Sequence, residues 1–400
     1  MAQYLKNELP MFYFQNIKKI IAVICICLVS SVCFAKPVPQ LSAATLQPIN
    51  SQPQTSVSFL INGVNIKQLL TDQVKQGYST GIAIAVVTHQ NYHYYSFGKL
   101  NHSAKAPDVS QDTLFNIGSL ANLFHSALVA KFALAQKVKQ VSALNQVNQQ
   151  LSEQDQSSYE NFLSANILMP LQLTNTTYDL SPEQVDEAAQ GYDATDKSVE
   201  TDTNDTLYSS ASDLAKFLAA NMGAWKTPLE TALRISQQLS WQIDDTRHLF
   251  WQSSQGNGFS AFIGFDTQQQ MGVIVLTNSS NSLYTNNLAM HILYPNTKLL
   301  PIHTTAKISS TILQNYEGYY SAEKNTCTKI TAVKNKLIVT ALPKNIPYAI
   351  YPMSSTEFFS KVNQIEFSFV EDKTGNVLGL QIIQDGKKTL AFKVDQSQCG

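Results

Sequence analysis

Thr113-Leu114-Phe115-Asn116-Ile117-Gly118-Ser119 leads directly into a segment, 120–132, whose apolar residues form a wide stripe at helical spacing. Such a stripe is typical of a helix that is buried over most of its surface. Gly118 suits a turn before the helix, and serine is a favoured residue for capping a helix N-terminus. The sequence therefore predicts a buried helix with Ser119 at its N-terminus, as the cap of the first turn.

Apolar runs on both sides of this helix predict a sheet. Ile66–Gln76 has helical spacing, Ile82–Val87 is a continuous apolar run, and Tyr92–Phe97 alternates. Phe259–Phe265 and Met271–Thr277 form a second apolar pair further along the chain. Continuous runs of this length indicate buried strands. Together with the helices they predict an α/β (α+β) body.

Three further helices are predicted from apolar spacing: Ala143–Leu151, Tyr159–Met169 and Ser210–Asn221. Pro170 ends the second of them, because proline cannot continue a helix. Ser212 is expected to cap the third. Asp213 and Lys216 are three residues apart in it, which predicts an exposed ion pair worth a few tenths of a kcal/mol.

The chain changes character from about Ser310 to short alternating strands. Turn signals separate them at Lys334-Asn335-Lys336, Thr374-Gly375-Asn376 and Asp385-Gly386. The apolar positions expected to face one core are Tyr316, Tyr320, Ile338, Phe367, Phe369, Leu378, Leu380 and Ile382. The pattern predicts a separate all-β domain over 310–400, as a small barrel or sandwich.

The composition excludes a polyanion binder. The 400 residues contain 28 Lys+Arg and 29 Asp+Glu, for a formal net charge of -1. Nucleic-acid binding needs a clustered basic surface, so no nucleic-acid partner is expected. With 44% hydrophobic residues, the chain is long enough to bury an ample core as one large domain or two smaller ones.

The N-terminus has the pattern of a secretory signal. Lys18 and Lys19 precede the apolar segment Ile20–Val29, and Cys33-Phe34-Ala35 is a small-x-small cleavage site. The apolar segment is shorter than the roughly twenty residues of a membrane span, so no transmembrane anchor is expected after cleavage. We therefore expect a signal peptide over 1–35, a mobile lead-in over 36–56, and a periplasmic or secreted protein.

Cleavage after Ala35 would leave two cysteines, Cys327 and Cys399. An oxidising compartment would allow these two to form a disulfide that ties the C-terminus to the β domain. The alternative is two unrelated thiols, and the sequence does not choose between them.

The general motifs of cofactor and metal chemistry are missing from the sequence. The seven histidines form no pair with zinc-ligand spacing, and there is no phosphate loop, no dinucleotide glycine fingerprint and no Gly-x-Ser-x-Gly elbow. We expect no metal and no cofactor. The informative pair is Gly118-Ser119.

Several segments of the chain occur in the order of a known family. They are Gly81–Gly98, Leu114–Ser119, Tyr159–Leu163 with Pro170–Thr174, Gly191-Tyr192, Tyr208–Phe217 and Gly258–Phe265. In this order the chain resembles the penicillin-recognising serine hydrolases, on the side of class C β-lactamases and D-Ala-D-Ala carboxypeptidase-like esterases. The resemblance implies an antiparallel sheet flanked by helices over 57–300, followed by a small lipocalin-like β-barrel domain over 310–400.

The family's first motif, Ser-x-x-Lys, places a lysine one helical turn after the nucleophilic serine, where it helps to take the hydroxyl proton. The matching residues here are Ser119 and Asn122, so an amide stands in place of the lysine. Lys131 is twelve residues on, and His125, six residues on, points to another side of the helix. By the resemblance, Ser119 is a nucleophile without a base.

The second motif, Tyr-x-Asn or a similar sequence, belongs to a long segment after the nucleophile helix. Only 137–158 separates that helix from the Tyr159 segment, and it contains no tyrosine. The loop is therefore interpreted as deleted, which would leave part of the cleft wall missing and the pocket open to water.

The third motif, Lys-Thr-Gly or His-x-Gly, lies on the strand that faces the serine. Counting back from Gly258 places Gln252-Ser253-Ser254 there, without the cation and without the glycine that allows close approach. Asn122, Gln252 and Ser254 are thus the candidate substrate-binding positions.

These substitutions imply an exported, β-lactamase-related serine hydrolase homologue with impaired catalysis. One alternative is an active β-lactamase, carboxypeptidase or esterase that works through acyl-Ser119. Another is a module that binds cell-wall peptide or a protein. The expected small-molecule partners are a β-lactam, a cell-wall peptide or an ester.

Overall fold

We analysed a computed structural model of the chain. It describes residues 60–61, 64–89, 91–136, 147, 149, 151, 156–200, 206–323 and 326–399. The predicted signal peptide (1–35), the lead-in (36–56), most of the predicted helix 143–151 and most of the proposed deletion site (137–158) lie outside these residues. Within the described part of the chain, no helix is both long and apolar enough to cross a membrane.

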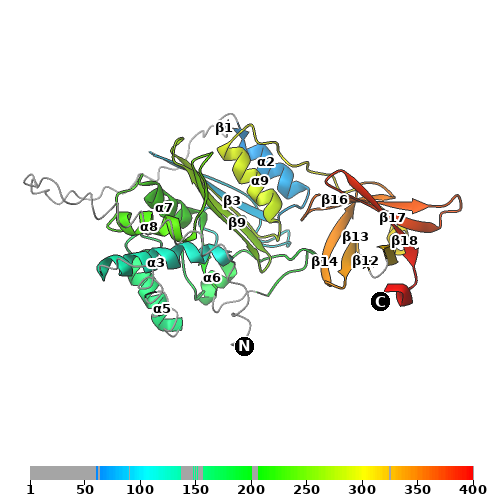
Figure 1. Ribbon diagram of the computed structural model, residues 1–400, viewed down its shortest axis with the longest axis horizontal. Helices are drawn as coiled ribbons and strands as arrows, with labels where there is room; N and C mark the ends of the chain where they lie inside the picture. The colour runs from blue at the N-terminus through cyan, green and yellow to red at the C-terminus, as the bar shows by residue number, and fades with distance from the viewer. Residues whose placement is uncertain are drawn as a thin grey trace, which may run out of the picture.

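The body contains a six-stranded antiparallel sheet (Figure 1). Its strands, in spatial order, are β4 (Tyr92–Gly98), β3 (Gly81–Thr88), β10 (Met271–Thr277), β9 (Phe259–Asp266), β8 (Leu249–Gly256) and β7 (Gln242–Asp244). The continuous apolar runs of the sequence form the central strands β3, β10 and β9. Strands whose two faces are both covered have to be apolar throughout.

Helices cover both faces of this sheet (Figure 1). One face carries α2 (Ile66–Lys75) and α9 (Ser282–Leu293), and the other carries α3 (Ala121–Ala135), α7 (Ala211–Met222) and α8 (Glu230–Ser240). Strand β3 supplies both cores, since side chains alternate along a strand. Ile82, Ile84 and Val86 pack on the α2/α9 side, and Ala83, Ala85 and Val87 pack on the other.

Shorter elements connect these layers. They are β1 (Leu60–Ile61), β2 (Val64–Asn65), β5 (Phe115–Asn116), the 3₁₀ turn η1 (Gly118–Leu120), α5 (Gln156–Leu163), the π-helical turn η2 (Ser164–Leu168), α6 (Pro182–Glu187) and β6 (Tyr208–Ser209). Strand β5 pairs with β6 and fixes the chain just before η1 and α3.

Two predictions about α7 are wrong. Its cap is Ser210, whose Oγ accepts a hydrogen bond from the Asp213 amide, and Ser212 lies inside the helix. Asp213 is not exposed but fully buried, with its carboxylate bonded to Thr176 Oγ1 at 2.9 Å and to Lys216 Nζ at 3.0 Å. Asp213 is buried because the segment that contains Thr176 packs over the start of α7. Helical spacing alone does not reveal such a contact.

The C-terminal part is a closed antiparallel barrel, which confirms the predicted β domain (Figure 1). Helix α10 (Ser310–Asn315) precedes its eight strands: β11 (Gly318–Glu323), β12 (Thr326–Val333), β13 (Lys336–Leu342), β14 (Ile346–Pro352), β15 (Glu357–Ser360), β16 (Ile365–Glu371), β17 (Val377–Gln384) and β18 (Lys387–Val394). Closure of the barrel pairs β18 with β11 and leaves no open edge.

Most of the predicted barrel core is found inside it, including Tyr316, Tyr320, Phe367 and Phe369. Ile338 and Leu378 are the exceptions: Ile338 packs against a separate cluster that contains Tyr78 and Tyr284 of the body, and Leu378 has 51% of its surface exposed. The pairing of β16 with β17 shifts register at this point, so that Leu378 is an extra residue in a bulge. A bulge interrupts the alternation of side chains, and the sequence pattern carried no sign of it.

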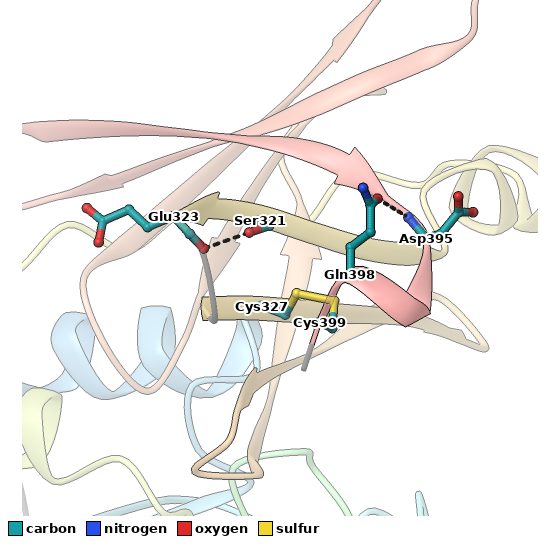
Figure 2. Close-up of a disulfide and its surroundings, with 6 residues drawn as sticks. All are labelled: Ser321, Glu323, Cys327, Asp395, Gln398 and Cys399. Carbon is teal, nitrogen blue, oxygen red and sulfur yellow. Dashed lines mark hydrogen bonds between the residues drawn. A yellow bond between two sulfur atoms is a disulfide. The ribbon is translucent and has the colours of Figure 1, made fainter.

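A disulfide closes the end of the chain onto the barrel. Figure 2 shows Cys327 of β12 bonded to Cys399 in the terminal turn η3 (Gln396–Cys399), with their Cα atoms 5.5 Å apart. Of the two alternatives that the sequence left open, this structure has the disulfide.

The barrel contacts the body through a polar and aromatic junction. Lys336 Nζ of β13 donates to Asp196 Oδ2 at 2.8 Å, and the Ala349 amide of β14 donates to the Ala194 carbonyl at 2.8 Å. Lys361 Nζ lies 3.8 Å from the centre of the Tyr351 ring. Burial lowers the pKa of the Lys361 ammonium to about 8, because a charged group is poorly solvated there. No described hydrogen bond joins the residues of this junction to Ser119.

Candidate active site

The backbone before α3 places Ser119 at the surface of the body. Asn116 Oδ1 accepts from the Gly118 amide at 2.9 Å, and the Ile117 amide donates to the Leu207 carbonyl at 3.1 Å. Gly118 has a φ of 49°, a left-handed conformation that glycine adopts at little cost. These contacts hold Ser119 exposed in η1, with the buried helix α3 directly behind it.

Ser119 does not cap the helix, contrary to the sequence prediction. The N-cap residues of η1 and α3 are Ile117 and Leu120, and neither side chain accepts a hydrogen bond from a backbone amide. Ser119 Oγ accepts no described hydrogen bond from an amide of the first turn of α3, as a capping oxygen would. Capping therefore does not explain a hydroxyl at this position.

Strand β8 brings Ser254 to Ser119 across 135 residues of sequence. The Ser119 amide donates to Ser254 Oγ at 3.0 Å, and Ser254 is only 7% exposed. A Cβ added to Gly118 would collide with the same Ser254 Oγ, so the two segments are in close contact. The structure thus brings together the first and third candidate motifs, as the motif spacing predicts.

The other two residues of the third motif are directed elsewhere. Gln252 Oε1 accepts from the Ser253 amide at 3.0 Å, and Gln252 Nε2 donates to the Ser240 carbonyl at the end of α8 at 3.0 Å. Ser253 Oγ accepts from Asn286 Nδ2 of α9 at 3.5 Å. Gln252 is therefore tied to α8, and it has no described hydrogen bond with Ser119 or Asn122.

The hydroxyl of Ser119 has no base beside it among the residues that the structure describes. No hydrogen bond to Ser119 Oγ is formed by any of them. Asn122 is exposed on the first turn of α3 and likewise makes no described hydrogen bond. A neutral amide does not accept a proton at neutral pH, so Asn122 cannot replace the lysine of the Ser-x-x-Lys motif.

The nearest titratable groups on α3 have other partners. His125 Nδ1 and Tyr159 Oη are 3.0 Å apart, and burial together with Tyr178 raises the pKa of the Tyr159 hydroxyl. Lys131 Nζ donates to the Asn166 carbonyl at 3.0 Å, and burial lowers the pKa of its ammonium. Lys131 is also about 18 Å along the helix from Ser119, at 1.5 Å per residue.

The contact between His125 and Tyr159 was not predicted from the sequence. The two residues belong to α3 and α5, and no spacing rule connects positions on separate helices. Asn116 was also missed as the residue that fixes Gly118. Among the described residues, no group of three or more His, Cys, Asp or Glu side chains could hold a metal ion.

The structure thus places Ser119 just before a buried helix, beside an antiparallel sheet with helices on both faces. The family model described as Beta-lactamase matches residues 149–293. Over this segment the chain is similar to the β-lactamase family.

Three solved structures are similar to part of this chain. One is a D-alanine carboxypeptidase from Burkholderia cenocepacia, 15% identical over 57% of this chain and 98% of that chain, with a TM-score of 0.46. Another is a β-lactamase/D-alanine carboxypeptidase from Pseudomonas syringae, 17% identical over 59% and 100%, with a TM-score of 0.48. A third is a class C β-lactamase from Rhodobacter sphaeroides, 16% identical over 58% and 99%, with a TM-score of 0.47. No curated protein sequence matches the chain.

Proposed function

We propose that this chain is an exported β-lactamase homologue whose catalysis is impaired, because its nucleophile position lacks a base. One observation carries the proposal: Ser119 Oγ has no hydrogen bond to any described group that could take its proton, and Asn122 stands where the family has a lysine. A serine hydroxyl is a weak nucleophile at neutral pH without such a group.

The size of the expected impairment follows from how catalytic groups cooperate. Removing one member of a nucleophile and base unit costs on the order of ten-thousand-fold to a millionfold in rate. Gln252, at the position of the family's cation, is uncharged and bonded to α8, so a substrate carboxylate also lacks its usual partner there. The proposed ligands remain those of the family: a β-lactam, or a D-Ala-D-Ala-type peptide.

The proposal includes export and two domains. A disulfide between Cys327 and Cys399 supports an oxidising compartment, where such bonds persist. The separate barrel core supports a division into a β-lactamase-like domain over 57–300 and a barrel domain over 310–400. The mature chain would begin after Ala35 and be periplasmic or secreted.

A fluorescent penicillin followed by intact-mass measurement tests the impairment. In a competent enzyme, Ser119 Oγ bonds to the β-lactam carbonyl carbon, the ring C–N bond breaks, and the hydroxyl proton passes to the ring nitrogen. We expect no more than a trace of adduct on the wild-type protein after prolonged incubation. A stoichiometric adduct that disappears in Ser119→Ala would overturn the proposal, and Ser119→Ala also corrects for labelling elsewhere.

A further inference from the structure

We propose that the Ser254 hydroxyl occupies the position that a substrate carbonyl oxygen would need, and so blocks acylation of Ser119 independently of the missing base. This inference rests on the proposed function, because it concerns the same site. It assigns Ser254 the role of an inhibitory residue, supplied by the protein itself.

The donor in question is the Ser119 amide. When a serine attacks a carbonyl, the oxygen becomes negative and is stabilised by backbone amides, commonly including the amide of the serine itself. Such donors lie 2.7–3.1 Å from the oxyanion position. In this structure the Ser119 amide nitrogen is 3.0 Å from Ser254 Oγ. Ser254 Oγ thus already lies at the distance from the Ser119 amide nitrogen that the substrate oxygen would need.

The position of Ser254 is fixed by its surroundings. Its strand, β8, pairs with β9 along its whole length, and Ser254 is opposite Ala261. Gly118 packs directly against the Ser254 side chain, so the hydroxyl is confined between β8 and η1. A substrate carbonyl can reach the amide only by displacing this hydroxyl.

The sequence explains why the block exists in this chain. Motif spacing puts Ser254 at the glycine of Lys-Thr-Gly or His-x-Gly, the position where the family's strand comes closest to the nucleophile. Glycine leaves that space empty, whereas serine places Cβ and Oγ in it. The loss of the lysine and the gain of this side chain are separate changes with separate consequences.

The two changes predict how activity would return. Asn122→Lys supplies a group able to take the hydroxyl proton but leaves the amide occupied. Asn122→Lys combined with Ser254→Gly frees the amide as well. Since one oxyanion donor is worth about a hundredfold to a thousandfold in rate, we expect the double variant to be acylated at least about tenfold faster than Asn122→Lys alone.

The experiment compares second-order rates of adduct formation with a fluorescent penicillin, each checked by intact mass. The matched control is Asn122→Lys with Ser96→Gly, which puts the same substitution on β4 at the far edge of the sheet, and we expect its rate to equal that of Asn122→Lys. Ser254→Ala in the lysine background keeps Cβ but removes the hydroxyl, so its rate should be intermediate. Thermal unfolding verifies that each variant is folded.

A folded double variant that reacts no faster than Asn122→Lys would overturn the inference. That result is distinct from failure of the proposed function, which would show as adduct on the wild-type protein. If the Ser254→Gly variant fails to fold, hydrogen exchange without substrate still tests the inference. Hydrogen exchange at the Ser119 amide should be faster in Ser254→Ala than in the wild type, and an unchanged rate would count against the contact on which the inference depends.

Discussion

Helix α7 and the turn η1 that leads into α3 each have a serine at their start, but the two serine side chains have opposite surroundings. At α7, Ser210 Oγ accepts from the Asp213 amide, and the buried Asp213 carboxylate accepts from the Asn175 amide at 2.7 Å, from Thr176 Oγ1 and from Lys216 Nζ. Each of these groups stabilises the helix start and the segment packed against it.

At the start of α3, only the backbone is satisfied. The Gly118 amide bonds to Asn116 Oδ1 and the Ser119 amide to Ser254 Oγ, while Ser119 Oγ makes no hydrogen bond with any described residue. Stability therefore explains the polar residues of α7 and does not explain the hydroxyl of Ser119. That difference supports the proposal that Ser119 is the nucleophile position of an impaired site.

The largest loss of stability is expected from a substitution of Asp213. Asp213→Ala removes the acceptor of three hydrogen bonds, and among their donors the Asn175 amide has no other described partner. We therefore expect the free energy of unfolding to fall by about 3 kcal/mol. Urea unfolding measures it. Glu230→Ala, which removes an exposed ion pair with Arg234 on α8, is the control and should change stability by less than about 0.5 kcal/mol. Equal losses in the two variants would show that the α7 network contributes little.

Substitution of Ser210, the capping residue of α7, should give the next largest loss in the free energy of unfolding. Ser210→Ala removes the oxygen that accepts from the Asp213 amide, and a lost cap costs about 1 kcal/mol. Ser212→Ala does not test the cap, because Ser212 Oγ donates to Asp112 Oδ1 and lies 2.9 Å from Ser210 Oγ. A loss below about 0.5 kcal/mol in Ser210→Ala would contradict the assignment of Ser210 as the cap.

The sequence predicted the layers of the molecule better than its polar contacts. Continuous apolar runs located β3, β9 and β10, because a strand buried on both faces has to be apolar throughout. Alternation with turn signals located the barrel but misplaced Ile338, which packs against the body, and Leu378, since a bulge depends on how β16 and β17 pair. Periodicity reports which face is buried, and it does not report irregular pairing.

The site shows the same limit. Motif order placed Ser254 near Ser119, and the structure joins them by a hydrogen bond. The burial of Asp213 and the contact between His125 and Tyr159 were missed, because each depends on segments that only the folded chain brings together. Residue type and spacing carried the prediction that Ser119 lacks a base, while the hydrogen bond between the Ser119 amide and Ser254 Oγ required three-dimensional contacts.

The smallest effect on stability is expected at Ser119 itself. Ser119→Ala removes an exposed hydroxyl without a described partner, so the free energy of unfolding should stay within about 0.5 kcal/mol of the wild type. The same urea titration used for Asp213→Ala measures it. A loss above about 1 kcal/mol would mean that the hydroxyl does structural work at the start of α3, and the contrast with α7 would then disappear. A neutral result would leave reactivity, present or lost, as the explanation for a serine at this position.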